Sequence, residues 1–395
     1  MKKSIFSPER AIRFSVGRSP TSAMGRFFSP ERAARILRTP LQGLCSTHSS
    51  EGLRPSLMRF ALSGLLFAAL ALLAGCGQSD DAAKTIRMKY SVFFPPEHIH
   101  AKLAQSWAKE IEERTDGRVQ ITVFTAGSLT KPENCYQGVL DGFSELGMSA
   151  FAYTRGRFPL LEGLDLPHGY PDGVTATRVA NELIEQFKPA EIGNVQFLYC
   201  HAHGPGILAT RKGNNVESLE DFKNLQVRAT GFSGSMVTAL GGKPVNMPQN
   251  DTYEALQKGT VQATFCPVEA LKGWRHGEVI DAVTDSRCVG YTTVFYVIMN
   301  KRVWEKLPGD IQQVFNEVNR EWMKKHGEAW NTADDEGREY ILSLDPPRKT
   351  FTLSDDEQAR WRTAVQPVIE DYVKGDSPEV PRRAFLEALQ KAMAE

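Results

Sequence analysis

Residues 86–124 read IRMKYSVFFPPEHIHAKLAQSWAKEIEERTDGRVQITVF, and this stretch predicts a strand, a helix and a second strand. Apolar side chains occupy alternate positions over 86–92 and again over 119–123, which is the period of a half-buried strand. Between them, residues 100–114 carry an apolar stripe at helical spacing, and Asp116-Gly117 ends it. Strands joined by a helix pair in parallel, so the stretch predicts an α/β sheet.

The same alternation continues along the chain. Further strands are expected at 195–200, 225–229, 261–266 and 294–299, with helices between them. After Pro308 the pattern changes to long helices, expected at 310–342, 354–373 and 382–393. The predicted fold class is α/β, with two lobes of parallel or mixed sheet flanked by helices.

Composition and charge exclude several classes of protein. The 395 residues are 41% hydrophobic and 24% charged, as in ordinary globular proteins. The 47 basic and 47 acidic side chains cancel, but residues 1–75 hold eleven basic and three acidic ones, which leaves the remainder at about −8. An acidic body argues against a general nucleic-acid surface.

The first 84 residues are predicted to lie outside the fold. Residues 1–57 are expected to be a basic leader or an overextended reading frame that precedes a start at Met58. Residues 58–75 have the cation, apolar run and small residues of a bacterial secretory signal. The motif at 73–76, LAGC, resembles a lipobox, which implies lipid attachment at Cys76 and a membrane-anchored periplasmic protein; an ordinary cleaved signal is the alternative. Residues 76–84 are expected to be a tether.

No catalytic motif supports an enzyme. P-loop, zincin and dinucleotide-binding patterns are absent, and TGFSGS at 230–235 has Ser where a nucleophile elbow needs its last Gly, so Ser233 is expected to be a helix N-cap. The pairs His98/His100 and His201/His203 permit a zinc site, but no third ligand is indicated. We expect no cofactor and no metal.

Cysteine spacing gives little further direction. Cys135, Cys200, Cys266 and Cys288 form no CxxC pair, which disfavours zinc-ribbon and thioredoxin-like folds. One or two disulfides and buried free thiols both remain open.

Four blocks resemble one family in the same order along the chain. They are AKLAQSWAKEIEERTDGRVQITVFTAGSL (101–129), LEDFKNLQVR (219–228), YEALQKGTVQATFCP (253–267) and FYVIMNKRVWEKLP (295–308). Together they resemble the DctP-like substrate-binding proteins of TRAP transporters. The resemblance implies a two-lobed periplasmic-binding-protein fold with an interlobe cleft and a long spanning helix. It also implies a receptor that closes on an organic acid and delivers it to an ion-gradient-driven permease.

The resemblance places the carboxylate-binding arginine of the family at Arg228. A planar guanidinium at the carboxyl end of a strand suits bidentate carboxylate binding, whereas the alternative is an arginine paired with a structural acid. Several polar cleft groups of sugar-acid-binding members are replaced here, with Cys266 where Asn is frequent. Hydroxyl groups of a sugar acid would lose water without compensation, so we expect an aromatic or apolar monocarboxylate, including 2-oxo and 2-hydroxy acids.

The remaining predicted ligand-binding residues follow from the same correspondence. The apolar candidates are Phe94, Met148, Phe151, Tyr153, Met247 and Phe265. The polar candidates are His98, His203, Gln249 and Thr292, together with Cys266.

The expected domains are lobe I, residues 85–205 plus 293–320, and lobe II, residues 206–292 plus 321–395 with the C-terminal helices. The expected hinge lies around 204–206 and 289–293. Three other functions remain open. They are a receptor for an ABC importer or sensor kinase, a periplasmic hydrolase using Cys200 with His201, and a structural lipoprotein.

Overall fold

The structure, a computed structural model, describes residues 85–395. The expected leader (1–57), signal peptide (58–75), tether (76–84) and lipid attachment site Cys76 lie outside the described residues. Within 85–395, none of the helices combines the length and apolar character needed to cross a bilayer.

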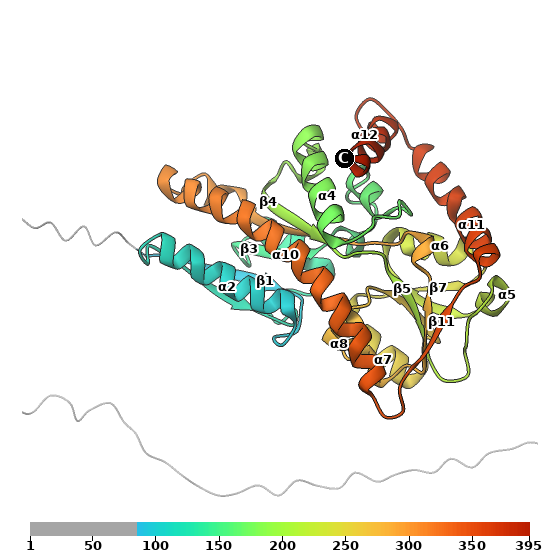
Figure 1. Cartoon of the computed structure of the whole chain (residues 1–395). Coiled ribbons are helices and arrows are strands. Elements are labelled where there is room, and N and C mark those ends of the chain that lie inside the picture. The colour runs from blue at the N-terminus through green and yellow to red at the C-terminus, as the bar shows by residue number, and fades with distance from the viewer. Residues whose placement is uncertain (1–84) are drawn as a thin grey trace, which may run out of the picture. The chain divides into compact units, whose positions relative to one another are not determined.

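Sheet A has five strands in the order β2-β1-β3-β10-β4 (Figure 1). They are β1 (Ile86–Val92), β2 (Val119–Phe124), β3 (Leu146–Ala150), β4 (Val195–Ala202) and β10 (Val294–Asn300). β1 pairs in parallel with β2, with Ile86 opposite Val119, which confirms the strand–helix–strand prediction for the opening stretch. β10 lies antiparallel between β3 and β4, so the sheet is mixed.

Sheet B has six short strands in the order β11-β9-β5-β8-β6-β7. They are β5 (Ile207–Thr210), β6 (Gln226–Ala229), β7 (Lys243–Asn246), β8 (Ala263–Cys266), β9 (Ala282–Asp285) and β11 (Lys349–Thr352). β6 is parallel to both β7 and β8, whereas β5 is antiparallel to β8 and β9. The carboxyl ends of β6 and β8 therefore meet at one edge of sheet B, where ligand sites of α/β sheets form.

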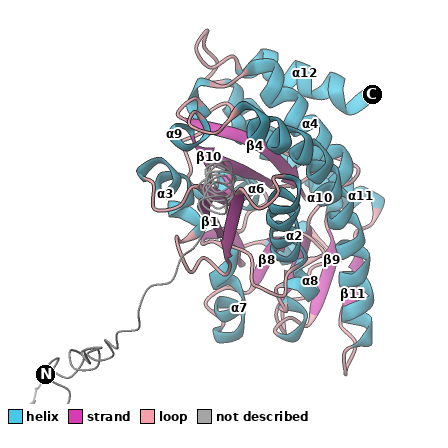
Figure 2. Ribbon diagram, turned by 90° about the vertical axis from the view of Figure 1, so that its left-hand side faces the viewer, coloured by secondary structure: helices cyan, strands magenta, loops and turns pink. Residues whose placement is uncertain are grey.

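Helices cover both sheets, and one reaches from sheet to sheet. They are α2 (Ile99–Arg114), α3 (Cys135–Asp141), α4 (Gly173–Phe187), α5 (Leu219–Phe222), α6 (Gly231–Ala239), α7 (Gln249–Lys258), α8 (Ala270–Gly273), α9 (Lys301–Trp304), α10 (Gly309–Ser343), α11 (Asp355–Val373) and α12 (Arg382–Ala394). α10 contacts α2, α4 and β4 beside sheet A and α8 beside sheet B (Figures 1 and 2). The long spanning helix expected from the resemblance is therefore present.

The N-terminus of α6 differs from the prediction that Ser233 is a helix N-cap. Thr230 has the extended backbone of the N-cap position, and Ser233 is the third helical residue. The Ser233 hydroxyl accepts a hydrogen bond from the Thr230 N–H at 2.9 Å, which completes a capping box. The hydroxyl thus stabilises a helix end.

The chain passes from sheet to sheet through two neighbouring segments, β4 to β5 and β9 to β10. The Gly206 N–H donates to the Tyr291 carbonyl at 2.9 Å, and the Thr292 hydroxyl donates to the His203 carbonyl. A Cβ at Gly206 would overlap the Tyr291 ring, because it would lie only 2.7 Å from Cε1 of Tyr291. Glycine therefore allows the two segments to approach closely at the place where a hinge was predicted.

All strands of sheet A fall within 85–205 and 293–320, and those of sheet B within 206–292 and 321–395. The C-terminal α12, however, packs on α4 beside sheet A, with Phe385 and Leu389 in the same buried cluster as Val179 and Leu183. The lobe boundaries remain a prediction.

Candidate functional site

A cavity lies where the two sheets face each other, and its walls come from both. From the sheet A side come Phe93, Phe94, Tyr153, His203, Thr293 and Phe295; from the sheet B side come Arg228, Thr230, Gln249, Pro267, Glu269, Trp274 and Tyr291; α10 adds Trp330. The cavity has a free volume of ≈ 20 Å³, close to the space that one water molecule requires. The walls are nearly in contact, so entry of an organic solute requires the two sides to separate.

Arg228 lies near the carboxyl end of β6, and only 2% of its surface is exposed. Its Nε donates to the Met247 carbonyl at 3.1 Å, and one terminal nitrogen donates to the Phe265 carbonyl at 3.4 Å. No carboxylate of residues 85–395 lies within 4.0 Å of this guanidinium. The alternative of a structural ion pair is therefore not what the structure shows. A buried cation without a counter-ion is costly, and the described residues supply Arg228 with carbonyl oxygens alone.

The imidazoles around Arg228 are uncharged at neutral pH. Burial lowers the pKa of His203 to about 4, and the positive charge of Arg228 acts in the same direction. Burial likewise lowers the pKa of His276 to about 3, again assisted by Arg228. The guanidinium therefore supplies the positive potential of the cavity without help from these histidines.

Aromatic rings form the apolar walls. Phe93 lies nearly parallel to Trp274, with ring centroids 6.0 Å apart and 21° between planes. Phe295 lies nearly parallel to Trp330 and to Phe93, at 5.3 and 5.8 Å and 19° in both cases. Since Phe93 and Trp274 come from opposite sheets, this ring stack closes the cavity from both sides, and its parallel faces suit a flat ligand.

The predicted site residues fall into three groups. Arg228, Phe94, Tyr153, Gln249 and His203 line the cavity. The second group supports the lining. In this group the Met247 and Phe265 carbonyls hold Arg228, Thr292 bonds the His203 carbonyl, and His98 contacts Glu269.

The third group lies away from the cavity lining. Met148 is buried within β3, and Phe151 packs edge-on against Phe158. Cys266 is buried opposite Ile207 in the β8–β5 ladder. Met148 and Cys266 point into the packed core because alternate residues of a strand face opposite sides of the sheet, whereas Phe151 lies in the turn of 3-10 helix that follows β3.

Sequence analysis did not single out several lining residues. These are Thr230, Pro267, Glu269, Trp274, Tyr291, Thr293, Phe295 and Trp330, whereas Phe93 was an alternative to Phe94 for one cleft position of the family. Pro267, Glu269 and Trp274 follow β8. Because ligand sites form at the carboxyl ends of such strands, their position in the sequence could have identified them as candidates. Trp330 had no local signal, because it belongs to an ordinary apolar stripe of a long helix.

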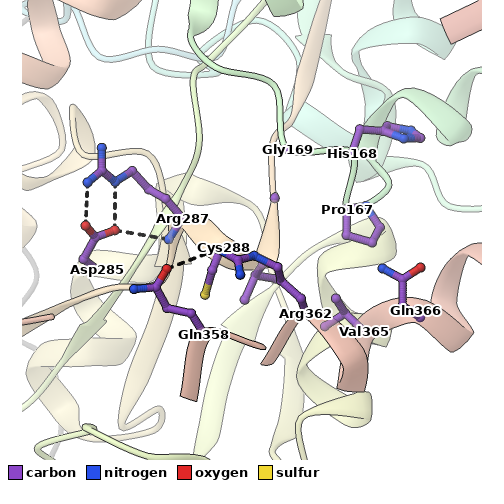
Figure 3. A pocket seen from close by; sticks show the side chains of 12 residues that line it. Pro167, His168, Gly169, Asp285, Arg287, Cys288, Gln358, Arg362, Val365 and Gln366 are labelled. Atoms are coloured by element: carbon purple, nitrogen blue, oxygen red, sulfur yellow. Dashed lines mark hydrogen bonds and ion pairs between the residues drawn. The ribbon is translucent and has the colours of Figure 1, made fainter. Parts of the chain in front are cut away.

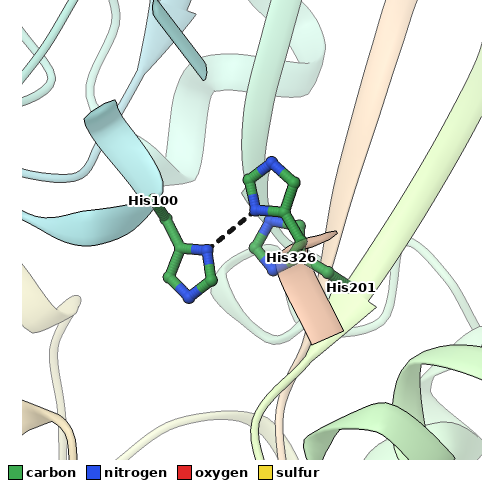
Figure 4. Close-up of side chains that lie close together, drawn as sticks. All are labelled: His100, His201 and His326. Carbon is green, nitrogen blue, oxygen red and sulfur yellow. Dashed lines mark hydrogen bonds between the residues drawn. The ribbon is translucent and has the colours of Figure 1, made fainter. Parts of the chain in front are cut away.

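Three buried histidines, His100, His201 and His326, bring ligand atoms within 4.8 Å of one another (Figure 4). His326, on α10, is the third member that the HxH spacing did not reveal. Nδ1 of His100 and Nδ1 of His326 lie 2.8 Å apart, so one donates and the other accepts. The three rings are nearly parallel, with 9–13° between each pair of ring planes.

This arrangement does not suit a shared metal ion. A metal bound through Nδ1 would displace the bond between His100 and His326 and the bond that His201 accepts from the Trp330 indole. Burial lowers the pKa of His326 to about 3 and the pKa of His201 and His100 well below the ordinary value. The cluster is a packed group of neutral rings.

Cys200 and His201 do not form a nucleophile–base pair. They are consecutive on β4, so their side chains lie on opposite faces of sheet A. Cys200 packs in a cluster with Tyr296 and Val179, whereas His201 stacks on Phe295. Burial raises the pKa of the Cys200 thiol well above its usual value.

A wider hollow of ≈ 550 Å³ lies at the surface beside α11 (Figure 3). Two of its charged groups are already paired, because Arg287 donates to Asp285 through Nε at 2.8 Å, and its other arginine, Arg362, is exposed to solvent. The smaller cavity is the stronger candidate for ligand binding, since it contains the buried guanidinium of Arg228, which has no carboxylate of residues 85–395 within 4.0 Å.

Known proteins resemble this chain in sequence and in fold. Residues 90–376 match the model of the family described as bacterial extracellular solute-binding protein, family 7. A solute-binding protein of Albidiferax ferrireducens is 25% identical over 254 residues, which cover 61% of this chain and 74% of that protein.

Two crystal structures show the shared fold. A TRAP periplasmic solute-binding protein of Desulfovibrio salexigens, in an open complex, is 28% identical with a TM-score of 0.68 and covers 78% of this chain and 95% of that one. A TRAP solute-binding protein of Rhodoferax ferrireducens, in complex with copurified benzoate, is 23% identical with a TM-score of 0.73 and covers 78% and 98%. The two-lobed periplasmic-binding fold predicted from the sequence is confirmed.

Proposed function

Because the chain belongs to the bacterial extracellular solute-binding proteins of family 7, we propose that it is a TRAP receptor for an aromatic or apolar monocarboxylate. The observation that carries the proposal is Arg228, a buried guanidinium with no carboxylate of the described residues 85–395 within 4.0 Å, in a cavity walled by aromatic rings. A ligand carboxylate would complete the charge of Arg228, and bidentate pairing would fix its orientation.

The walls favour a flat or apolar body behind the carboxylate. Phe93, Trp274, Phe295 and Trp330 present nearly parallel faces. An aromatic ring between them gains stacking and apolar burial. The copurified benzoate of the Rhodoferax protein is a solute of this class, which supports the proposal.

Capture proceeds by closure of the two sides on the acid. The lining residues come from both sheets, so a ligand that touches both sides binds the closed form more tightly and shifts the population toward it. The segments that pair at Gly206 and Tyr291 are the proposed hinge. They connect lobe I with lobe II, with the lobe boundaries that the sequence predicts. The closed receptor then delivers the acid to a TRAP permease.

We further propose that residues 58–75 direct export and that Cys76 carries the lipid that holds the receptor at the membrane. Support for this comes from the sequence alone: the apolar run and the LAGC motif at 73–76. Mass spectrometry of the membrane fraction, with a Cys76→Ala control, tests it.

Thermal unfolding with matched ligands tests the receptor proposal. Benzoate and phenylacetate are compared with benzamide, which keeps the ring and shape of benzoate without its charge. We expect the acids to raise the midpoint of unfolding and benzamide to leave it unchanged. Equal shifts for benzoate and benzamide, or a shift with glucuronate alone, would contradict the assigned ligand class.

A further inference from the structure

The cavity contains a second buried charged group, Glu269, which has no role in carboxylate binding. Glu269 follows β8, and only 1% of its surface is exposed. Its backbone N–H donates to Oδ1 of Asp334 on α10 at 2.8 Å. A Cβ at Gly273 would overlap Oε1 of Glu269, so glycine leaves room for the carboxylate. The local structure therefore holds Glu269 in the cavity wall.

Both oxygens of Glu269 retain hydrogen-bonding capacity. Oε1 lies 2.6 Å from Nε2 of His98, but the two atoms are not aligned for a hydrogen bond. Among residues 85–395, neither carboxylate oxygen has an aligned hydrogen-bond donor. A buried carboxylate that lacks donors loses the solvation it had in water, which makes Glu269 a strong acceptor for a ligand group.

His98 is the neighbour that fixes the position of Glu269 by contact. Nδ1 of His98 accepts the backbone N–H of His100 at 3.2 Å, so the ring proton is on Nε2, toward Glu269. Phe94 stacks on the His98 ring, with centroids 4.3 Å apart. His98 belongs to the loop before α2 and Glu269 to the segment after β8, so their contact joins the two sides of the cavity.

The cavity thus has two fixed charges of opposite sign, Arg228 and Glu269, which both line it and lie more than 4.0 Å apart. A simple monocarboxylate would neutralise Arg228 and leave Glu269 without a donor. A ligand with a hydrogen-bond donor in addition to its carboxylate would satisfy both groups. This charge pattern distinguishes between otherwise similar aromatic acids.

We propose that Glu269 is a specificity-determining residue, which accepts a hydrogen bond from a hydroxyl or ammonium group of the carboxylate ligand. The inference rests on the proposed function, because it assigns the second polar group of the same ligand. His98 is the positioning residue for Glu269.

Calorimetry with matched aromatic acids tests this assignment. Benzoate is compared with its three hydroxy isomers and its three aminomethyl isomers, the latter bearing ammonium. We expect at least one substituted acid to bind tenfold or more tightly than benzoate. Tighter binding by hydroxy isomers alone identifies a hydroxyl donor, and by aminomethyl isomers alone an ammonium donor; either supports the proposal.

Two substitutions separate the role of Glu269 from a structural one. Glu269→Leu removes the acceptor. The affinity of the best substituted acid should then exceed that of benzoate by less than threefold, while benzoate binds as well as before or better. Glu269→Gln keeps a neutral acceptor, so it should retain part of a hydroxyl preference and lose an ammonium preference. Glu336→Gln, an exposed α10 residue paired with Lys272, is the control. Melting curves establish that each variant is folded.

The outcomes distinguish the two proposals. Binding of benzoate without any preference for a donor-bearing isomer overturns the role of Glu269 and leaves the receptor function intact. A preference that survives in Glu269→Leu overturns it too. Binding of no aromatic acid at all overturns both.

Discussion

The indole N–H of Trp330 donates a hydrogen bond to Nδ1 of His201 at 3.0 Å, and this contact joins α10 to β4 inside the protein. Because indole nitrogen only donates, Nδ1 of His201 is the acceptor and the proton of the neutral ring is on Nε2. Trp330 also lines the cavity. The bond therefore fixes a wall of the proposed ligand site to a histidine that must remain uncharged.

The histidine cluster predicts a loss of stability in acid. Burial lowers the pKa of His326 to about 3, whereas an unfolded histidine titrates near 6.5. Below pH 6.5 the unfolded chain binds a proton that the folded chain does not, so the free energy of unfolding falls as pH decreases toward 3. For His326 alone, the loss at pH 5 is about 2 kcal/mol.

Paired urea titrations at pH 7 and pH 5 measure this contribution. His326→Gln cannot titrate, so the difference in unfolding free energy between the native protein and this variant should shrink by about 2 kcal/mol at pH 5. The native protein must be compared with the variant at each pH, because burial also raises the pKa of Asp334 to about 7. Protonation of Asp334 increases the free energy of unfolding as pH falls, which opposes the effect of His326. Lys325→Gln, on the exposed side of the same helix, should show a constant difference. A constant difference for His326→Gln would mean that the cluster accepts protons freely.

Replacement of Arg228 predicts opposite effects on binding and stability. Arg228→Met removes the partner of the ligand carboxylate and should weaken benzoate binding by about 100-fold or more, as expected for a desolvated charge pair. The unliganded variant should be as stable as the native protein or more stable, since an uncompensated buried cation is removed.

Calorimetry with benzoate and urea unfolding without it provide the two measurements. Arg275→Ala, which removes an exposed guanidinium paired with Glu278, should change neither quantity appreciably. Benzoate affinity within threefold of the native value in Arg228→Met would contradict the role of Arg228.

The strand–helix alternation and the place of Arg228 were predictable because both depend on local pattern. The apolar alternation over 86–92 sets the pairing of β1 with β2, and the block LEDFKNLQVR places Arg228 at the end of a strand. Polar residues after β8 were equally accessible to strand-end reasoning, yet Glu269 is one of 47 acidic residues and nothing in its local sequence distinguishes it. Its significance arises from burial.

Contacts between residues far apart in the sequence could not be predicted from local pattern. Trp330 and His326 lie on the buried stripe of α10, which by spacing alone indicates core packing. Their proximity to His201 and to the cavity depends on the path of α10 from sheet A to sheet B. Likewise, the placement of α12 beside α4 depends on where α11 ends, and local periodicity does not specify it.

Thiol chemistry follows from burial. Cys135, Cys200 and Cys266 are buried and free, and Cys288 is half-buried and free. Burial raises the pKa of Cys135 to about 12 and that of Cys288 to about 11, so few thiolates exist at pH 8. We expect alkylation at pH 8 to modify these cysteines slowly in the folded protein, with Cys288 first, and all four rapidly in guanidinium chloride. Peptide mapping assigns the sites; a peptide with two of them linked would contradict the free-thiol state.

The proposed hinge predicts a strict requirement for glycine at 206. A Cβ at this position would overlap the Tyr291 ring, and the Gly206 N–H is already bonded to the Tyr291 carbonyl, so the two segments cannot separate without losing that bond. Gly206→Ala should lower the free energy of unfolding by about 1–3 kcal/mol, as overpacking does. Gly309→Ala, where added atoms meet open space, should change it by less than about 0.5 kcal/mol. In a Tyr291→Ala background most of the cost of Gly206→Ala should disappear, since the ring is gone and only the close contact with the Cys266 carbonyl oxygen at 3.1 Å remains. If Gly206→Ala lowers the free energy of unfolding equally in the Tyr291→Ala background, the Tyr291 ring is not the reason that position 206 requires glycine.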